Sequence, residues 1–103
     1  MPEVRFQVLV NGRPVCTAGL DGFGSLEARV SSTRLPAETL PAIFAPEEHL
    51  DLFVGGHDLA IGDVNWGRVP LSPGDEVIIR VFGPGRADPP TEVDPPGPDD
   101  LPF

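Results

Sequence analysis

Lysine and tyrosine are absent from the sequence, and cysteine and tryptophan occur once each. The missing lysine excludes Schiff-base catalysis and a phosphate-loop lysine, and the missing tyrosine excludes a phenolic acid or base. Seven arginines stand against 16 acidic residues, so the formal net charge is −9. This excess of negative charge excludes a generally basic surface for binding nucleic acid, and it favours binding to a basic protein partner.

The sequence also lacks a second cysteine, and this absence indicates the cellular compartment that we expect for the protein. Cys16 alone cannot form a disulfide within the chain, so we expect no disulfide scaffold of the secreted type. Residues 1–6 lack the basic region and apolar run of a signal peptide, and no stretch approaches the roughly 20 apolar residues of a membrane span. We expect a single small cytoplasmic domain with no membrane partner.

Proline and glycine, by contrast, are abundant, with 14 and 12 of 103 residues, and predict many turns between short elements. Alternating apolar residues predict strands at 4–10, 26–31, 49–54 and 77–82, with a short strand around 64–66, and a hairpin after residue 10 predicts a returning strand through residues 14–17. The strand at 77–82 is apolar on both faces, which predicts a central position. We predict an all-β fold, a small antiparallel β-sandwich or partly open barrel of five or six strands. The alternative is an α+β β-grasp domain with a helix near residues 24–34.

Two dipeptides that contain glycine predict where strands end. An Asn-Gly pair at positions 11 and 12 predicts a tight hairpin, because a type I′ turn needs positive φ at both central residues. Folding the chain back there places Val15 opposite Val8 and Pro14 opposite Leu9, where the proline nitrogen faces away from the partner strand. The Gly-Gly pair at positions 55 and 56 predicts the end of the strand before it.

A proline-rich loop is expected over residues 35–48. Its three prolines are spaced so that one continuous helix cannot form. The loop also carries an apolar stripe, formed by Leu35, Leu40, Ile43 and Phe44. We expect a lid that closes the open end of the core, and the alternative is a docking surface for a partner.

Candidate catalytic and metal-ligating residues are few. The only cluster with ligand chemistry is His49, Asp51, His57 and Asp58, and no further ligand stands at a recognisable spacing. We expect a solvated strand face there, with no metal and no other cofactor. Cys16 is expected to be a small core residue rather than a nucleophile. Because no serine-hydrolase or dinucleotide-binding motif occurs, we predict that the protein is not an enzyme.

Direct nucleic-acid binding would need a local arginine patch. The candidates are Arg5, Arg29 and Arg80, which the strand pattern places on outward faces. Stacking platforms are scarce, since Trp66 is the only indole and most phenylalanines occupy core-like positions. The chain before residue 84 has 11 acidic residues against six arginines. We therefore do not expect direct nucleic-acid binding.

The composition changes sharply after Gly83. Residues 84–103 hold seven of the 14 prolines and five acidic residues against one arginine. Such a stretch buries too little apolar surface to offset the entropy lost on ordering. We predict a folded β domain over residues 1–83 and an extended, disordered, acidic tail over residues 84–103.

The last five residues are Asp99, Asp100, Leu101, Pro102 and Phe103. This ending resembles the C-terminal tip of bacterial single-stranded DNA-binding proteins, which recruits repair, recombination and replication enzymes. The resemblance implies that Phe103 fills an apolar pocket on a protein partner while its carboxylate meets a basic residue. Leu101 would add contact, and the two aspartates would steer the tip towards a basic rim. The resemblance covers the tip and not the oligonucleotide-binding barrel of that family.

We expect a non-catalytic protein-interaction module whose tip docks on a DNA-repair or replication protein. One alternative is an acidic partner-neutralising protein of the immunity or inhibitor type, which would bind through the β domain. The other is a ubiquitin-like β-grasp protein, although such modifiers normally end in Gly-Gly and this chain ends in Pro-Phe. The first two hypotheses place the binding energy in different parts of the chain, the tail and the body surface.

Overall fold

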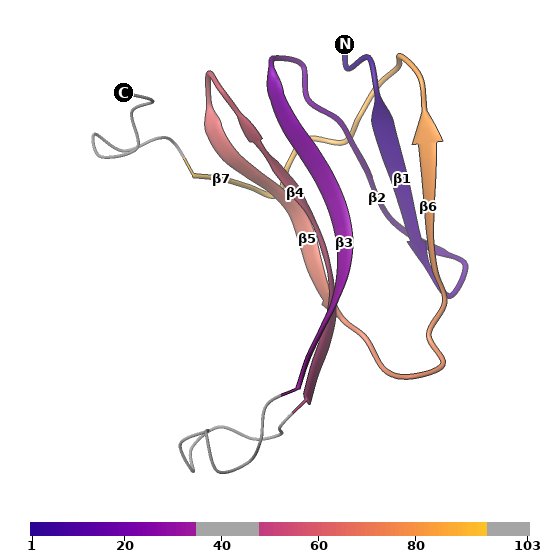
Figure 1. Cartoon of the computed structure of the whole chain (residues 1–103). Coiled ribbons are helices and arrows are strands. Elements are labelled where there is room, and N and C mark those ends of the chain that lie inside the picture. Colours follow the sequence, from indigo (N-terminus) through magenta and orange to yellow (C-terminus); the bar gives the residue numbers. More distant parts are fainter. Residues whose placement is uncertain (35–47, 95–103) are drawn as a thin grey trace.

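The computed structural model describes residues 1–34 and 48–94, which form seven strands in two antiparallel sheets (Figure 1). The three-stranded sheet has the order β2-β1-β6, with β1 at Arg5–Val10, β2 at Arg13–Ala18 and β6 at Val77–Phe82. The four-stranded sheet has the order β3-β4-β5-β7, with β3 at Gly24–Arg34, β4 at Glu48–Asp58, β5 at Gly62–Pro70 and β7 at Glu92–Asp94.

The prediction of a small all-β fold is confirmed. The two sheets pack on each other without closing into a barrel, and β7 brings the strand number to seven. The β-grasp alternative is wrong, because its expected helix at 24–34 is the strand β3. Among the described residues no helix is long and apolar enough to cross a membrane. The expected lid or docking loop lies outside the described residues, apart from Glu48, which begins β4.

The β1–β2 hairpin forms as predicted, with a shift of one residue. Its two turn residues have positive φ angles of 52° and 79°, as a type I′ turn requires. Pro14 pairs with Leu9, which confirms that part of the register. The expected pair of Val15 with Val8 is wrong, because a β-bulge leaves Val15 as an extra residue and Val8 pairs with Cys16. Sequence alternation does not reveal such a bulge.

Strand β4 continues through the two glycines that were expected to end it. A β-bulge lies between Val54 and Gly55, where the chain re-aligns against β5. A Cβ atom on Gly55 would lie 2.5 Å from Cζ of Phe53, and one on Gly56 would overlap the carbonyl oxygen of Ser25 in β3. The glycines therefore allow close approach of neighbouring groups within the sheet, rather than a turn.

The core lies between the two sheets. Its buried side chains come from β1 and β2 on one side and from β4 and β5 on the other, and they are Val8, Cys16, Ala18, Leu52, Val54, Val64 and Trp66. Strand β2 packs over β5, and β1 packs over the centre of the other sheet. The edge strands β6 and β3 therefore lie on the same side of the sandwich.

Strand β6 lies at an edge, so the prediction of a central position is wrong. Its outer face carries Ile78 and Phe82, and Phe82 packs beneath Arg5, whose guanidinium carbon lies 5.4 Å from the ring centre. Its inner face carries Ile79 and Val81, which are 40% and 68% exposed. The apolar residues on the two faces of β6 therefore have different environments. Phe82 on the outer face contacts Arg5, and Ile79 and Val81 on the inner face border an incompletely covered core.

The folded body extends to Asp94, beyond the predicted boundary at Gly83. After β6 the chain runs along the sandwich, and residues 92–94 form β7, which pairs with β5. Residues 84–94 of the predicted tail thus lie along the body, and residues 95–103 lie outside the described part of the chain. The average composition of this segment does not show that a few residues between its prolines, such as Asp88 and Thr91, form hydrogen bonds to the body.

Candidate functional site

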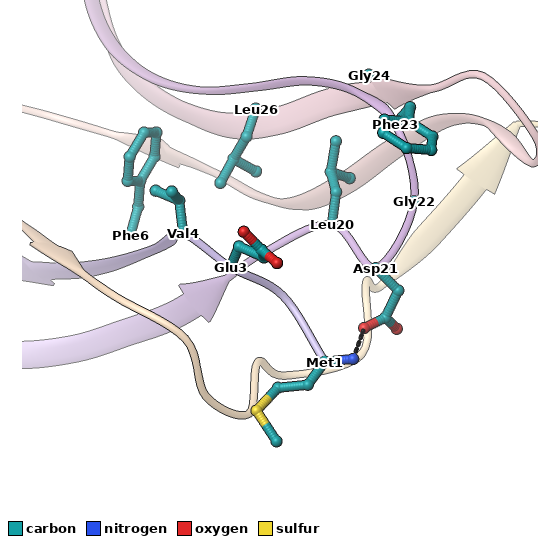
Figure 2. A pocket seen from close by; sticks show the side chains of 10 residues that line it. All are labelled: Met1, Glu3, Val4, Phe6, Leu20, Asp21, Gly22, Phe23, Gly24 and Leu26. Carbon is teal, nitrogen blue, oxygen red and sulfur yellow. Dashed lines mark ion pairs between the residues drawn. The ribbon is translucent and has the colours of Figure 1, made fainter.

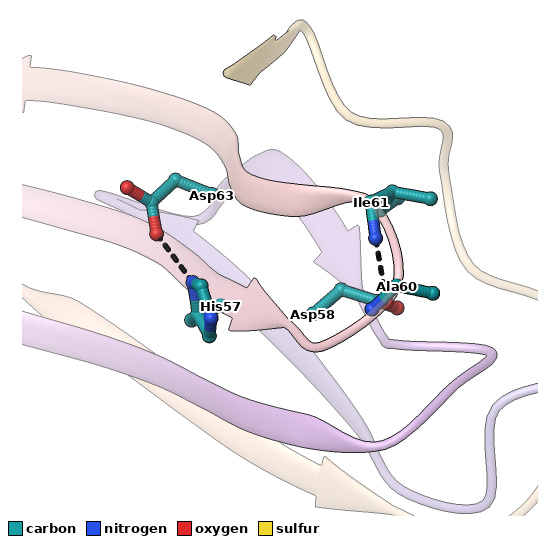
Figure 3. A network of polar contacts seen from close by, with 5 residues as sticks. All are labelled: His57, Asp58, Ala60, Ile61 and Asp63. Atoms are coloured by element: carbon teal, nitrogen blue, oxygen red, sulfur yellow. Dashed lines mark hydrogen bonds and ion pairs between the residues drawn. The ribbon is translucent and has the colours of Figure 1, made fainter. Parts of the chain in front are cut away.

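Of the four candidate ligands, His57 and Asp58 lie at the β4–β5 hairpin (Figure 3), Asp51 lies beside Arg68, and the side chain of His49 lies outside the described part of the chain. The Asp58 carboxylate is buried and accepts hydrogen bonds from the backbone N–H groups of Ala60, at 2.8 Å, and Ile61, at 3.2 Å. Nδ1 of His57 lies 2.7 Å from a carboxylate oxygen of Asp63 across the hairpin. Among the side chains that the structure describes, which exclude those of Glu48 and His49, no three His, Cys, Asp or Glu groups lie close enough to hold a metal ion.

The outer face of β3, β4 and β5 carries a charged group of side chains around an aromatic ring. The guanidinium carbons of Arg29 and Arg68 lie 5.0 and 5.2 Å from the ring centre of Phe53. Each arginine also has a carboxylate within 4 Å, Glu27 at 3.6 Å and Asp51 at 3.5 Å. Glu27 and Arg29 lie side by side on this solvent face. Since both cations are paired, the face does not concentrate positive charge for phosphates.

The three arginines considered for nucleic-acid binding do not form one patch. Arg29 lies on β3 in the four-stranded sheet, whereas Arg5 and Arg80 lie in the three-stranded sheet. The Arg5 guanidinium donates hydrogen bonds to carbonyl oxygens of the chain after β6, the shortest being 2.9 Å to Gly83. Arg80 donates to the side chain of Gln7 at 3.3 Å. These arginines orient neighbouring chain segments.

Cys16 lies in the core, opposite Val8, and is 7% exposed. Burial, and to a lesser extent the nearby negative charge of Asp88, raise the pKa of its thiol from 9.0 to about 11. A nucleophilic cysteine needs a lowered pKa and access to solvent. The environment of Cys16 is the opposite of that and agrees with its expected position as a small core residue.

Cys16 should react about a hundredfold more slowly with a thiol reagent in the folded protein than in the unfolded chain at pH 8. The raised pKa lowers the thiolate fraction by about two powers of ten. The folded chain binds the thiol proton more tightly, so this contribution to stability is complete below about pH 9 and is lost between about pH 9 and 11. Disulfide-exchange kinetics with and without denaturant measure the difference, and equal rates would contradict it.

Asp88 holds the chain after β6 to both sheets. Its side chain accepts a hydrogen bond from the N–H of Thr17 in β2 at 2.8 Å, and its own N–H donates to the Thr17 carbonyl at 2.7 Å. Its carbonyl accepts the indole N–H of Trp66 in β5 at 2.7 Å. Thr91 then bonds to the carbonyl of Asn65 through both its N–H and its hydroxyl. These contacts, here called the Asp88 anchor, lead the chain directly into β7.

An open cavity of about 530 Å³ lies at one end of the sandwich, between the N-terminal residues and the β2–β3 connection (Figure 2). Figure 2 shows Phe6 of β1 and Leu26 of β3 approaching each other from the two sheets. Phe23 stands at the rim and is 85% exposed. The N-terminal amino group and Asp21, 3.2 Å apart, give the rim a polar side. The cavity is thus an uncovered end of the apolar core.

The uncovered core continues from this cavity along β6. Directly opposite residues of paired antiparallel strands share a face, so Val81 lies beside Phe6, and Ile79 beside Val8, on the inner side of the sheet. Across from them, Val30 on β3 is half-exposed. We call this surface the open side and define it by Val4, Phe6, Phe23, Leu26, Val30, Ile79 and Val81. Exposed apolar residues that gather on one side of a domain make that side a candidate interaction surface.

The sequence prediction did not find the open side, although the two-sided apolar pattern at 77–82 was a signal of it. The predicted site residues Asp99 to Phe103 lie outside the described residues, so their docking role stays a prediction. Comparison with protein families, curated proteins and solved structures finds no match to this chain.

Proposed function

We propose that the chain is a non-catalytic, cytoplasmic protein-interaction module that docks its C-terminal tip, residues 99–103, on a DNA-repair or replication protein with a basic pocket. The observation that supports this most is the Asp88 anchor together with β7, which holds the acidic, proline-rich segment to the body as far as Asp94. Only four residues, 95–98, separate the end of β7 from the start of the tip at Asp99. In this proposal, residues 84–94 attach the acidic segment to the body, and residues 99–103 at its end bind the partner.

The tip has the chemistry that such a pocket requires. In the proposed tip, Phe103 supplies both an aromatic ring and a terminal carboxylate, so one residue brings apolar surface and negative charge together. Asp99 and Asp100 add charge that attracts a basic rim over a distance of about 10 Å at ordinary salt. The net charge of −9 acts in the same direction on the approach of a basic partner.

The environments of the reactive groups favour a binding role over a catalytic one. The Cys16 thiol is buried with a raised pKa, and the Asp58 carboxylate caps a turn. His57 faces Asp63 on an exposed hairpin, away from any described cavity. A single thiol in a strand also suits the reducing cytoplasm.

The proposal is tested with the full-length protein and a variant whose residues 99–103 are replaced by a Gly/Ser sequence of the same length. We expect DNA-repair or replication proteins to co-purify with the wild type and to be lost from the variant, because the variant lacks the ring, the leucine and both aspartates. The Asp88 anchor is intact in both proteins, so the body is a matched control. If the variant retains every partner, the tip hypothesis is wrong, and the acidic partner-neutralising alternative would then place the binding site on the β domain.

A further inference from the structure

We propose that β6 pairs antiparallel with β6 of a second copy of this chain, so that two sandwiches join through one continuous six-stranded sheet. The order of that sheet would be β2-β1-β6 followed by β6-β1-β2 of the second copy. The pairing would cover the part of the open side that Ile79 and Val81 form. This inference is independent of the tip and concerns the opposite region of the molecule.

The outer edge of β6 presents backbone groups for a further strand. The N–H of Asn11 donates to the carbonyl of Glu76 at 2.8 Å, which fixes the hydrogen-bonding phase of the β1–β6 ladder. Because the ladder alternates, Val77, Ile79 and Val81 direct their N–H and C=O groups away from β1. No strand of the described chain takes up these groups, since β6 ends its sheet.

Strand β6 lacks the devices that protect other sheet edges from pairing. Edge β2 contains Pro14, which has no N–H, and edge β7 has only three residues. Edge β3 carries charged Glu27 and Arg29 side by side. By contrast, β6 has no proline, glycine or bulge, and its single charge is Arg80. An edge of this kind is suited to strand addition.

Symmetry and charge select one register. Residues paired across a two-fold axis must share a face, so the two registers with the largest overlap of the strands place either Ile79 or Arg80 opposite its own copy. Arg80 opposite Arg80 would bring like charges together in a closely spaced, non-hydrogen-bonded pair, which is destabilising. With Ile79 opposite Ile79, Val77 lies opposite Val81, and Arg80 lies opposite Ile78. This register makes every inner-face pair apolar and gives hydrogen-bonded pairs to the three residues with free backbone groups.

The charge distribution favours a second copy as the occupant of this edge. The chain has a net charge of −9, which opposes self-association in general. Strand β6, however, carries one positive charge and no negative charge. Two β6 edges that approach each other therefore bring no acidic residues of these strands together. In the selected register, Glu76 of the second copy lies one diagonal step from Arg80, within reach of its long side chain.

The test uses full-length Val81→Lys, with Val93→Lys on β7 as the matched control. Val81 is 68% exposed and Val93 is also exposed, so neither lysine disturbs the monomer, which circular dichroism verifies. In the dimer, position 81 faces Val77 of the second copy, where an ammonium group loses its hydration. Sedimentation equilibrium between about 1 µM and about 1 mM should give twice the 11.0 kDa chain mass for the wild type and Val93→Lys at high concentration. Val81→Lys should dimerise about a hundredfold or more weakly.

A second measurement separates strand pairing from other modes of dimerisation. The amides of Val77, Ile79 and Val81 should exchange hydrogen more slowly at high protein concentration than at low concentration, because only the dimer gives them acceptors. Ile78 and Arg80, whose amides face β1, should change little. A wild type that stays monomeric throughout, a Val81→Lys dimer as tight as the wild type, or exchange independent of concentration would each overturn the proposal.

Discussion

Deletion of Phe103 is expected to weaken binding of the tip to its partner by about a hundredfold or more. Burial of a phenylalanine side chain contributes roughly 1.5–3 kcal/mol. A hydrogen bond to a charged group contributes about 1.5–3 kcal/mol as well, and deletion removes the carboxylate from its place beside the ring. Each 1.4 kcal/mol is about tenfold in affinity, so the two losses together exceed a hundredfold.

The measurement uses fluorescent peptides covering residues 92–103 and a repair enzyme that binds the tip of bacterial single-stranded DNA-binding proteins. Phe103→Ala keeps the carboxylate and removes the ring, so it is the matched control and should have an intermediate affinity. Asp99→Ala should cost less, and its effect should shrink with added salt because exposed charges are screened. Equal affinity with and without Phe103 would make the ending incidental.

The sandwich could be predicted from the sequence because its determinants are local. Ser72 to Asp75 illustrate this, since proline and glycine at the two central positions predict a type II turn. In the structure the N–H of Asp75 donates to the carbonyl of Ser72 at 3.0 Å, and Gly74 has a φ of 97°. The turn also lowers the pKa of Asp75, through hydrogen bonds from the Asn11 side chain and the Ser72 backbone. Side-chain period and turn chemistry together determine such elements.

The features that the sequence did not reveal depend on contacts between distant residues. Asp88 is one acid among several in a proline-rich stretch, and only the fold brings it to Trp66 and Thr17. Likewise, the residues of β6 have the pattern of a central strand, and only the sheet order shows that, among the described strands, β6 pairs with β1 alone. Both errors arise because composition and periodicity describe a segment without its neighbours.

The two proposed binding elements lie at opposite edges of the molecule. The tail leaves the body from β7, which pairs with β5, whereas β6 and β3 border the open side. Pairing through β6 would therefore leave both tips of a dimer free to dock. Two tips on one particle raise the effective affinity for a partner with two sites. Because Val81→Lys does not alter the tail and the tip replacement does not alter β6, each variant tests one element.

Leu52→Ala is expected to destabilise the fold by about 2–5 kcal/mol. Leu52 is fully buried at the centre of β4, with Val30 opposite it on β3 and Val69 opposite it on β5. Removing its side chain forfeits apolar burial and leaves a cavity that two extended sheets cannot fill by collapse. A domain of this size has a free energy of unfolding on the order of 5–15 kcal/mol, so the loss is a large share of the total.

Leu59→Ala is the matched control, because Leu59 follows the same strand but is 69% exposed, and the change there should stay within about 0.5 kcal/mol. Urea unfolding followed by Trp66 fluorescence measures both variants, since the indole is itself in the core and reports on its exposure. The wild type and both variants should be compared at one protein concentration, because a dimer through β6 would add stability that depends on concentration. A loss at Leu52 no larger than that at Leu59 would mean that the two sheets do not pack through β4, and the sandwich core described above would be incorrect.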